Sequence, residues 1–252
     1  MTILRARPGA LCALLLLSLD ACGNQAAAEA PVMVFAAASL SAPFQPLARA
    51  FEARTPGCKL ELHFAGTSQL VVQVEQGAAV DVFASADDAN MQKLVAAGLV
   101  GSEPRLFARN ALAIATAAGN PKGIRSLLDL ARADLRVLLC GPEVPAGRYA
   151  REALAKAAVT VRSVSDEPSV KAVVSKVQLG EVDAGIVYAT DAATAGAKVA
   201  AVAIPGEHNV VATCPIAVLS KGRNRAVGEQ FVAFVLSRQG QDILKSFGFQ
   251  SP

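Results

Sequence analysis

The chain of 252 residues is 53% hydrophobic and 18% charged, so it has enough apolar side chains for a folded core and lacks the composition of a disordered protein. A formal net charge of only +3 excludes a strongly basic nucleic-acid binder, and 5% aromatic residues without tryptophan argue against base-stacking platforms. The length suits one large domain or two modest ones.

An apolar segment near the N-terminus has the pattern of a secretory signal and raises the mean hydropathy, which is +0.39. Arg5 and Arg7 precede the apolar run 10–19, which fits the ~7–15 residues of a signal-peptide core and is shorter than the ~20 of a membrane-spanning helix. The residues around Cys22 resemble a bacterial lipobox, which predicts removal of residues 1–21 and acylation of Cys22; the alternative is a cut after Ala30. We therefore expect a periplasmic protein, lipid-anchored to a membrane if Cys22 is acylated.

Strands and helices alternate along the first part of the mature chain. The apolar run 32–37 predicts a buried strand, and Ser39 is a candidate N-cap for the helix that follows and that Pro56-Gly57 ends. Further strands are predicted over 59–64 and 80–84, and further helices over 69–76 and in the stretch ending at Gly98.

The second part of the chain repeats this alternation. Ser169 is the predicted cap of a helix that has its valines on one side and ends at Gly180. The other predicted elements are strands over 112–117, 135–140, 183–188 and 199–204, and helices over 126–133, 148–157, 230–236 and 239–247. Buried strands that alternate with helices predict an α/β fold with mostly parallel sheets.

The sequence contains none of the common catalytic motifs. We find no G-x-S-x-G elbow, no S-x-x-K, no P-loop, no G-x-G-x-x-G and no H-E-x-x-H. His63 and His208 lie in a predicted strand and a polar loop, where a lone histidine is usually a surface or structural residue. The acidic pairs 87–88 and 166–167 precede helices, where carboxylates commonly complement the helix dipole. We therefore predict no catalytic residue and no cofactor.

Three cysteines belong to the predicted folded part of the chain, namely Cys58, Cys140 and Cys214. They form no C-x-x-C motif and have no histidine at metal-ligand spacing, so the sequence does not predict a zinc site. An odd number allows at most one disulfide among them. We predict that they are small buried hydrophobic residues.

Small or hydroxyl-bearing residues recur where a predicted strand passes into a helix. They are Ser39, Thr67 with Ser68, Ala146 before Arg148, and Ser169 with Val170. The first turn of a helix presents free N–H groups and a partial positive charge, and small side chains allow an anion to approach them. One such place is usually an ordinary N-cap. Four of them, with Tyr188 at the end of a buried strand as a further O–H donor, predict a convergent anion site.

The same segments resemble a known family, the periplasmic molybdate-binding proteins of bacterial ABC transporters. The resemblance extends from about Val32 to Phe249. It rests on five motifs in order and at compatible spacing: VFAAASL at 34–40, FAGTS at 64–68, DVFASAD at 81–87, VPAGRYA at 144–150 and GIVYATD at 185–191.

This resemblance implies a two-lobed, type II periplasmic-binding fold with the ligand in the cleft between the lobes. We expect lobe 1 to comprise residues 31–112 and 216–252, and lobe 2 to comprise residues 113–215. The implied role is that of a monomeric receptor that delivers molybdate, and by the same chemistry tungstate, to an inner-membrane permease. The molybdenum of the bound oxyanion is then the only metal.

The family holds its oxyanion through hydroxyl and backbone N–H groups without a charged side chain. Transferred to this sequence, the first-lobe ligands are Ser39 and Thr67, through side chain and amide. The second-lobe ligands are the amides of Ala146 and Val170 and the phenol of Tyr188. Gly66 and Thr67 both stand where serine is common in the family.

Two other functions compete with this one. A receptor of the same fold for sulfate, another oxyanion or a small organic acid would need a different pocket, and Arg148 is the candidate cation for a carboxylate, although its motif favours a helix-surface role. An exported hydrolase that uses Ser39 or Ser68 would need a base within reach, and neither histidine lies in a promising place.

Overall fold

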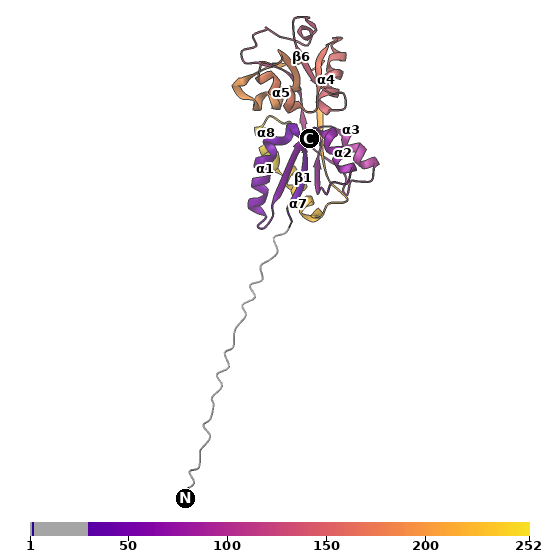
Figure 1. Cartoon of the computed structure of the whole chain (residues 1–252), viewed down its shortest axis with the longest axis vertical. Helices are drawn as coiled ribbons and strands as arrows, with labels where there is room; N and C mark the ends of the chain where they lie inside the picture. Colours follow the sequence, from indigo (N-terminus) through magenta and orange to yellow (C-terminus); the bar gives the residue numbers. More distant parts are fainter. Residues whose placement is uncertain (1, 3–29) are drawn as a thin grey trace.

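The computed structural model describes residue 2 and residues 30–252 (Figure 1). The predicted signal segment and Cys22 lie outside these residues, so the cleavage and acylation predictions stay predictions. No helix within the described part of the chain has the length and apolar character needed to cross a membrane.

The described chain forms two α/β lobes, one above the other in Figure 1. Each lobe has its own five-stranded sheet. The sheet of lobe 1 has the order β2 (Leu60–Ala65), β1 (Val32–Ala37), β3 (Val82–Ala84), β10 (Ala212–Val218) and β4 (Arg105–Asn110). The sheet of lobe 2 has the order β7 (Ser163–Glu167), β6 (Val137–Cys140), β8 (Ala184–Tyr188), β5 (Leu112–Ala117) and β9 (Val199–Ala203). The predicted two-lobed α/β fold is therefore confirmed.

Helices cover the sheets of both lobes. Lobe 1 contains α1 (Ser41–Arg54), α2 (Thr67–Glu75), α3 (Asp88–Ala96), α7 (Arg225–Leu236) and α8 (Arg238–Ser246). Lobe 2 contains α4 (Pro145–Lys156), α5 (Val170–Gln178) and α6 (Ala189–Thr194). Short 3-10 turns lie at Ala38–Leu40, Leu128–Ala131 and Gly196–Lys198.

Each sheet is mostly parallel, as the sequence predicted, and contains one strand that runs against the others. The first strand after each crossing between the lobes, β5 in lobe 2 and β10 in lobe 1, runs antiparallel to both of its neighbours. The remaining pairings are parallel. The parallel strands end at the side where the lobes meet, so a chain that enters a lobe from that side must run against them.

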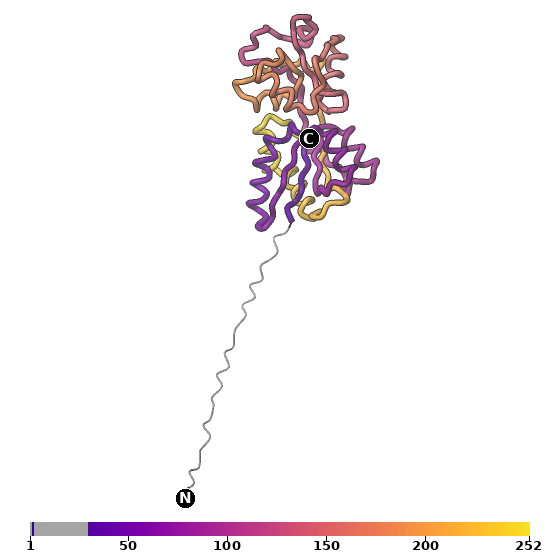
Figure 2. Tube along the Cα trace, viewed as in Figure 1, coloured from indigo at the N-terminus to yellow at the C-terminus, as the bar shows by residue number. Residues whose placement is uncertain are grey.

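The chain passes from lobe 1 to lobe 2 between β4 and β5 and returns between β9 and β10 (Figure 2). The boundary that we expected at 215/216 falls inside β10, all of which belongs to the sheet of lobe 1.

Three strands and two helices differ from the sequence expectations, since α6 (Ala189–Thr194) was not predicted either. β4, β7 and β10 were not predicted, because charged or polar residues and Pro215 interrupt the apolar patterns on which the prediction relied. The predicted helix over 126–133 is only the 3-10 turn Leu128–Ala131. By contrast, α5 begins and ends as predicted: the Ser169 side chain accepts a hydrogen bond from the Ala172 amide, and Gly180 adopts a φ of +70° just after the helix.

The lobes are built around large buried side chains. In lobe 1, Phe44 packs edge-on against Phe107 and Phe231, with ring centroids 5.9 and 6.1 Å apart. One apolar cluster continues from there across the junction of the lobes and includes Leu112 and Tyr188. The strand ends that face the junction are therefore held by packing on both sides.

Candidate anion-binding site

A small pocket lies between the two lobes, where the parallel strands end. Its lining from lobe 1 is Ala37, Ala38, Ser39, Gly66, Thr67 and Ala86, and its lining from lobe 2 is Val144, Pro145, Ala146, Ser169, Val170 and Tyr188. The structure thus brings together all five residues predicted as ligands, whereas Ser68 and Arg148 are not part of the lining. Its volume is about 10 Å³, compared with ~300–1,000 Å³ for pockets that hold drug-sized ligands and cofactors.

Three helices begin at this pocket. Thr67 and Val170 are the first residues of α2 and α5, and Ala146 is the second residue of α4. Amides in the first turn of a helix have no intrahelical carbonyl partner and carry the positive end of the helix dipole. The pocket therefore has the local electrostatics of an anion site built from backbone groups of both lobes.

Ser39 reaches the pocket differently from what the sequence predicted. It is not the N-cap of α1, because it lies inside the 3-10 turn Ala38–Leu40 and α1 has no side-chain cap. The tight turn directly after β1 places Ser39, which is 5% exposed, in the lining of the pocket. The prediction of a cap was wrong because the chain turns before the α-helix starts.

The Thr67 hydroxyl has a defined role in the lobe 1 wall. Its Oγ1 atom accepts a hydrogen bond from the Ala86 amide at 3.4 Å, and the residue is 1% exposed. A hydroxyl that accepts one hydrogen bond still has its proton to donate. The proton can therefore be donated to a group in the pocket, and Ala86, which sequence reasoning missed, orients it.

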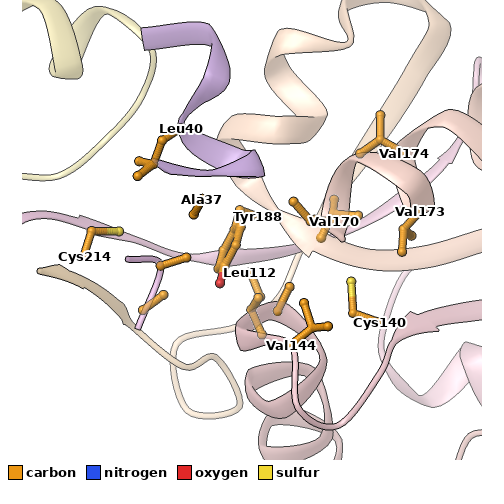
Figure 3. Packing of buried hydrophobic residues seen from close by; sticks show 14 of the residues in the cluster. Ala37, Leu40, Leu112, Cys140, Val144, Val170, Val173, Val174, Tyr188 and Cys214 are labelled. Atoms are coloured by element: carbon orange, nitrogen blue, oxygen red, sulfur yellow. The ribbon is translucent and has the colours of Figure 1, made fainter. Parts of the chain in front are cut away.

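Tyr188 provides the clearest sign of a missing partner. It is the last residue of β8 and is 2% exposed, and its hydroxyl has no hydrogen-bond partner among the described residues. Figure 3 shows it among Ala37, Val144 and Val170, which line the same pocket. Burial raises its pKa well above the usual value, so the hydroxyl keeps its proton. A buried donor without an acceptor is rare, and this hydroxyl is free to donate to a group bound in the pocket.

The pocket lining contains no charged side chain. Arg148 donates instead to Asp87, which is fully buried in lobe 1 and caps α3 by accepting a hydrogen bond from the Asn90 amide. Arg148 lies on α4 outside the pocket lining, with its side chain 36% exposed, and it also bridges the lobes, which the sequence did not predict. Since its charge is paired, Arg148 is not an unpaired cation for an organic carboxylate.

The pocket lacks the general base that the hydrolase alternative would need. The lining includes no histidine, aspartate or glutamate that could accept a proton from Ser39. His63 is exposed in β2, with its ring 4.8 Å from that of Phe35, and His208 lies in the loop after β9. Nothing in the lining activates a serine nucleophile.

Two of the three cysteines are buried thiols, as the sequence predicted. Burial raises the pKa of both Cys140 and Cys214 to about 12, so they stay neutral. Cys58 is half-buried and packs against the apolar cluster. Across residues 30–252 there is no group of three metal-ligating side chains.

Asp191 is a buried acid close to the site that sequence reasoning did not single out. It lies in α6, 1% exposed, with Oδ1 2.8 Å from Lys171 Nζ, while Oδ2 has no hydrogen-bond partner among the described residues. Burial raises its pKa to about 6, although the Lys171 ammonium opposes this shift. The carboxylate therefore reduces the stability of the folded state at neutral pH.

We expect Asp191 to make the free energy of unfolding depend on pH. Because its pKa is raised from 3.8 to about 6, its stabilising contribution is complete below pH 3.8 and is lost as the pH rises through 6. Between pH 7.5 and pH 5 the difference amounts to about 1 kcal/mol. Urea denaturation of the wild type and Asp191→Asn at both pH values measures this difference. The free energy of unfolding of the wild type should rise relative to that of Asp191→Asn when the pH is lowered from 7.5 to 5. A gap that is constant with pH contradicts this prediction.

Comparisons with known proteins agree with this architecture. The family described as "Bacterial extracellular solute-binding protein" matches residues 32–250. The chain is 42% identical to the "Molybdate-binding protein ModA" of Mycobacterium tuberculosis H37Rv, over 97% of both chains. A "substrate binding domain of putative molybdenum ABC transporter from Clostridium difficile" is 27% identical, with a TM-score of 0.67 over 88% of this chain and 99% of that one.

A fold comparison by itself does not separate one oxyanion from another. The sulfate-binding protein SubI of Mycobacterium tuberculosis superposes with a TM-score of 0.79 over 88% of this chain and 86% of that one, at only 20% identity. This likeness shows a shared fold, whereas the family match and the 42% identity extend over nearly the whole sequence. The chain belongs to the bacterial extracellular solute-binding protein family and, within it, to the molybdate-binding group.

Proposed function

We propose that this protein captures molybdate and delivers it to the membrane permease of an ABC transporter. The observation that carries the proposal is the convergence of Ser39, Thr67, Ala146, Val170 and Tyr188 from both lobes on one pocket without a charged side chain. The 42% identity to a protein named for molybdate binding supports the same ligand. We further propose that the protein acts in the periplasm as a monomer without a cofactor or an enzymatic activity.

The chemistry of the lining favours an anion that carries no proton. Amide N–H groups only donate, and no carboxylate is part of the lining. Molybdate, tungstate and sulfate are fully ionised near pH 7, whereas phosphate retains a proton that would need an acceptor. Burying that proton unpaired costs ~1–3 kcal/mol. The site therefore disfavours phosphate, because its lining offers no carboxylate to accept that proton.

Discrimination between molybdate and sulfate must come from size. The pocket is enclosed by residues of both lobes, so the distance between the two sets of donors fixes the radius of the anion that can contact all of them. The amides of α2, α4 and α5 are fixed to their helices, and the smaller sulfate cannot reach donors on both lobes at that separation. Tungstate is nearly the size of molybdate, and we propose that it binds as well.

Closure on the anion would give the permease a way to distinguish loaded from empty protein. Donors from both lobes are satisfied together only when the lobes are closed, so the ligand stabilises that arrangement. The loaded protein thereby presents one fixed pair of lobe surfaces. Acylation of Cys22, where it occurs, would keep the receptor close to the permease.

Thermal unfolding with different anions tests the proposal. At constant ionic strength, molybdate and tungstate should raise the unfolding temperature, since a ligand at 100 times its Kd stabilises by about 2.7 kcal/mol. Sulfate and phosphate at the same concentration should leave it unchanged. A response to sulfate in place of molybdate would make the protein a sulfate receptor, and no response to any of these oxyanions would refute the proposed function.

A further inference from the structure

An ion pair joins the lobes directly beside the pocket. Arg148 lies in the first turns of α4, two residues after Ala146, and its Nη2 donates to Oδ2 of Asp87. Asp87 follows Ala86, which lines the lobe 1 wall of the pocket. The ion pair therefore holds the turn of α4 that carries the Ala146 amide against lobe 1.

Asp87 does not depend on Arg148 to satisfy its carboxylate. Within lobe 1 it accepts hydrogen bonds from the Asn90 amide at 2.9 Å and from Asn90 Nδ2 at 3.1 Å, and Ser85 Oγ is 3.4 Å away. These contacts remain when the lobes separate, because Ser85, Asp87 and Asn90 are neighbours in sequence. Loss of Arg148 consequently leaves the Asp87 carboxylate hydrogen-bonded by Ser85 and Asn90, which limits the cost of removing one partner of a buried ion pair.

A second ion pair between the same segments provides a comparison. Lys93 Nζ in α3 lies 3.7 Å from Glu143 Oε2 just before α4, and the two side chains are 47% and 79% exposed. Exposed pairs of this kind contribute little because water and salt screen them. In the Arg148–Asp87 pair the carboxylate is 0% exposed, so its charge-assisted hydrogen bond is much less screened.

We propose that Arg148 is a positioning residue that stabilises the closed lobes and slows release of the bound anion. This rests on the proposed function, in which the lobes close on an oxyanion. Arg148 does not touch the anion and acts through Asp87, which forms the pair only when α4 lies against lobe 1. Closed protein gains one charge-assisted bond that open protein lacks, so the dissociation rate falls while the association rate changes little.

The dissociation rate of molybdate tests this role. Because the chain has no tryptophan, release is best followed with radioactive molybdate chased by unlabelled molybdate. Arg148→Gln should release the anion about 10-fold faster, which corresponds to about 1.4 kcal/mol. Arg148→Lys, which keeps the charge, should release molybdate at a rate between those of the wild type and Arg148→Gln. Lys93→Gln should release it at the rate of the wild type. Urea denaturation without ligand should show all four proteins folded, with a loss of stability in Arg148→Gln no larger than the about 1.4 kcal/mol that corresponds to the 10-fold faster release.

Small-angle scattering of the anion-free proteins gives a readout that does not need the ligand. Arg148→Gln should have a larger radius of gyration than the wild type and Lys93→Gln, because the open form gains population. Unchanged scattering and an unchanged release rate in Arg148→Gln would overturn the positioning role. A wild type that binds no oxyanion refutes the proposed function alone, since the scattering comparison still decides whether Arg148 holds the lobes together.

Discussion

Replacement of Tyr188 by phenylalanine should weaken molybdate binding about 10- to 150-fold and leave the anion-free protein at least as stable as the wild type. A hydrogen bond to a charged acceptor contributes ~1.5–3 kcal/mol, and 1.4 kcal/mol is about a tenfold change in Kd. Without ligand the Tyr188 hydroxyl is buried and has no partner among the described residues, so its removal takes away an unsatisfied group. Affinity and stability should therefore move in different directions.

The other tyrosine of the chain is the matched control. Tyr149 lies in α4, is half-buried and does not line the pocket. Tyr149→Phe keeps the ring over which the Arg148 guanidinium lies, 5.6 Å from the centroid. Isothermal calorimetry should give this variant the affinity of the wild type. Equal affinities for wild type and Tyr188→Phe would remove Tyr188 from the proposed ligand set.

Substitution of Val170 by proline should weaken molybdate binding about 10- to 150-fold, as Tyr188→Phe does, because it removes one backbone donor. Val170 is the first residue of α5, a position where proline is favoured and where the lost N–H has no intrahelical partner. The preceding residue, Ser169, has φ −156° and ψ 157°, which is the extended conformation that a residue before proline prefers. The helix should therefore form normally while the pocket lacks an amide.

Val170→Ala separates the amide from the side chain. Val170 is 3% exposed, so both substitutions remove apolar packing, but only proline removes the N–H. We expect Val170→Ala to unfold more readily and to bind molybdate within about threefold of the wild type, since about 0.6 kcal/mol corresponds to that change. If alanine weakens binding as much as proline does, the contribution of Val170 is packing, and the proposed amide contact is wrong.

Both predictions follow from features that are visible locally in the sequence. Ser169 followed by a valine stripe and Gly180 predicts where α5 begins and ends, because caps and apolar periodicity depend on residues within a few positions of one another. The run 183–188 likewise predicts that Tyr188 ends a buried strand. These short-range patterns, together with the resemblance of five motifs to one family, were enough to select five of the residues that line the pocket.

Other features depend on contacts between distant segments and had no local signal. The antiparallel direction of β5 and β10 follows from the side on which the chain enters each lobe. The 3-10 turn at Ser39 and the pairing of Arg148 with Asp87, 61 positions away, likewise appear only in the folded protein. The sequence alone determined most of the elements and the donor groups at their ends, since these rest on local conformational preference. Only the tertiary structure decided that the donors meet, because strand order, lobe approach and burial of charge are set by residues far apart in the chain.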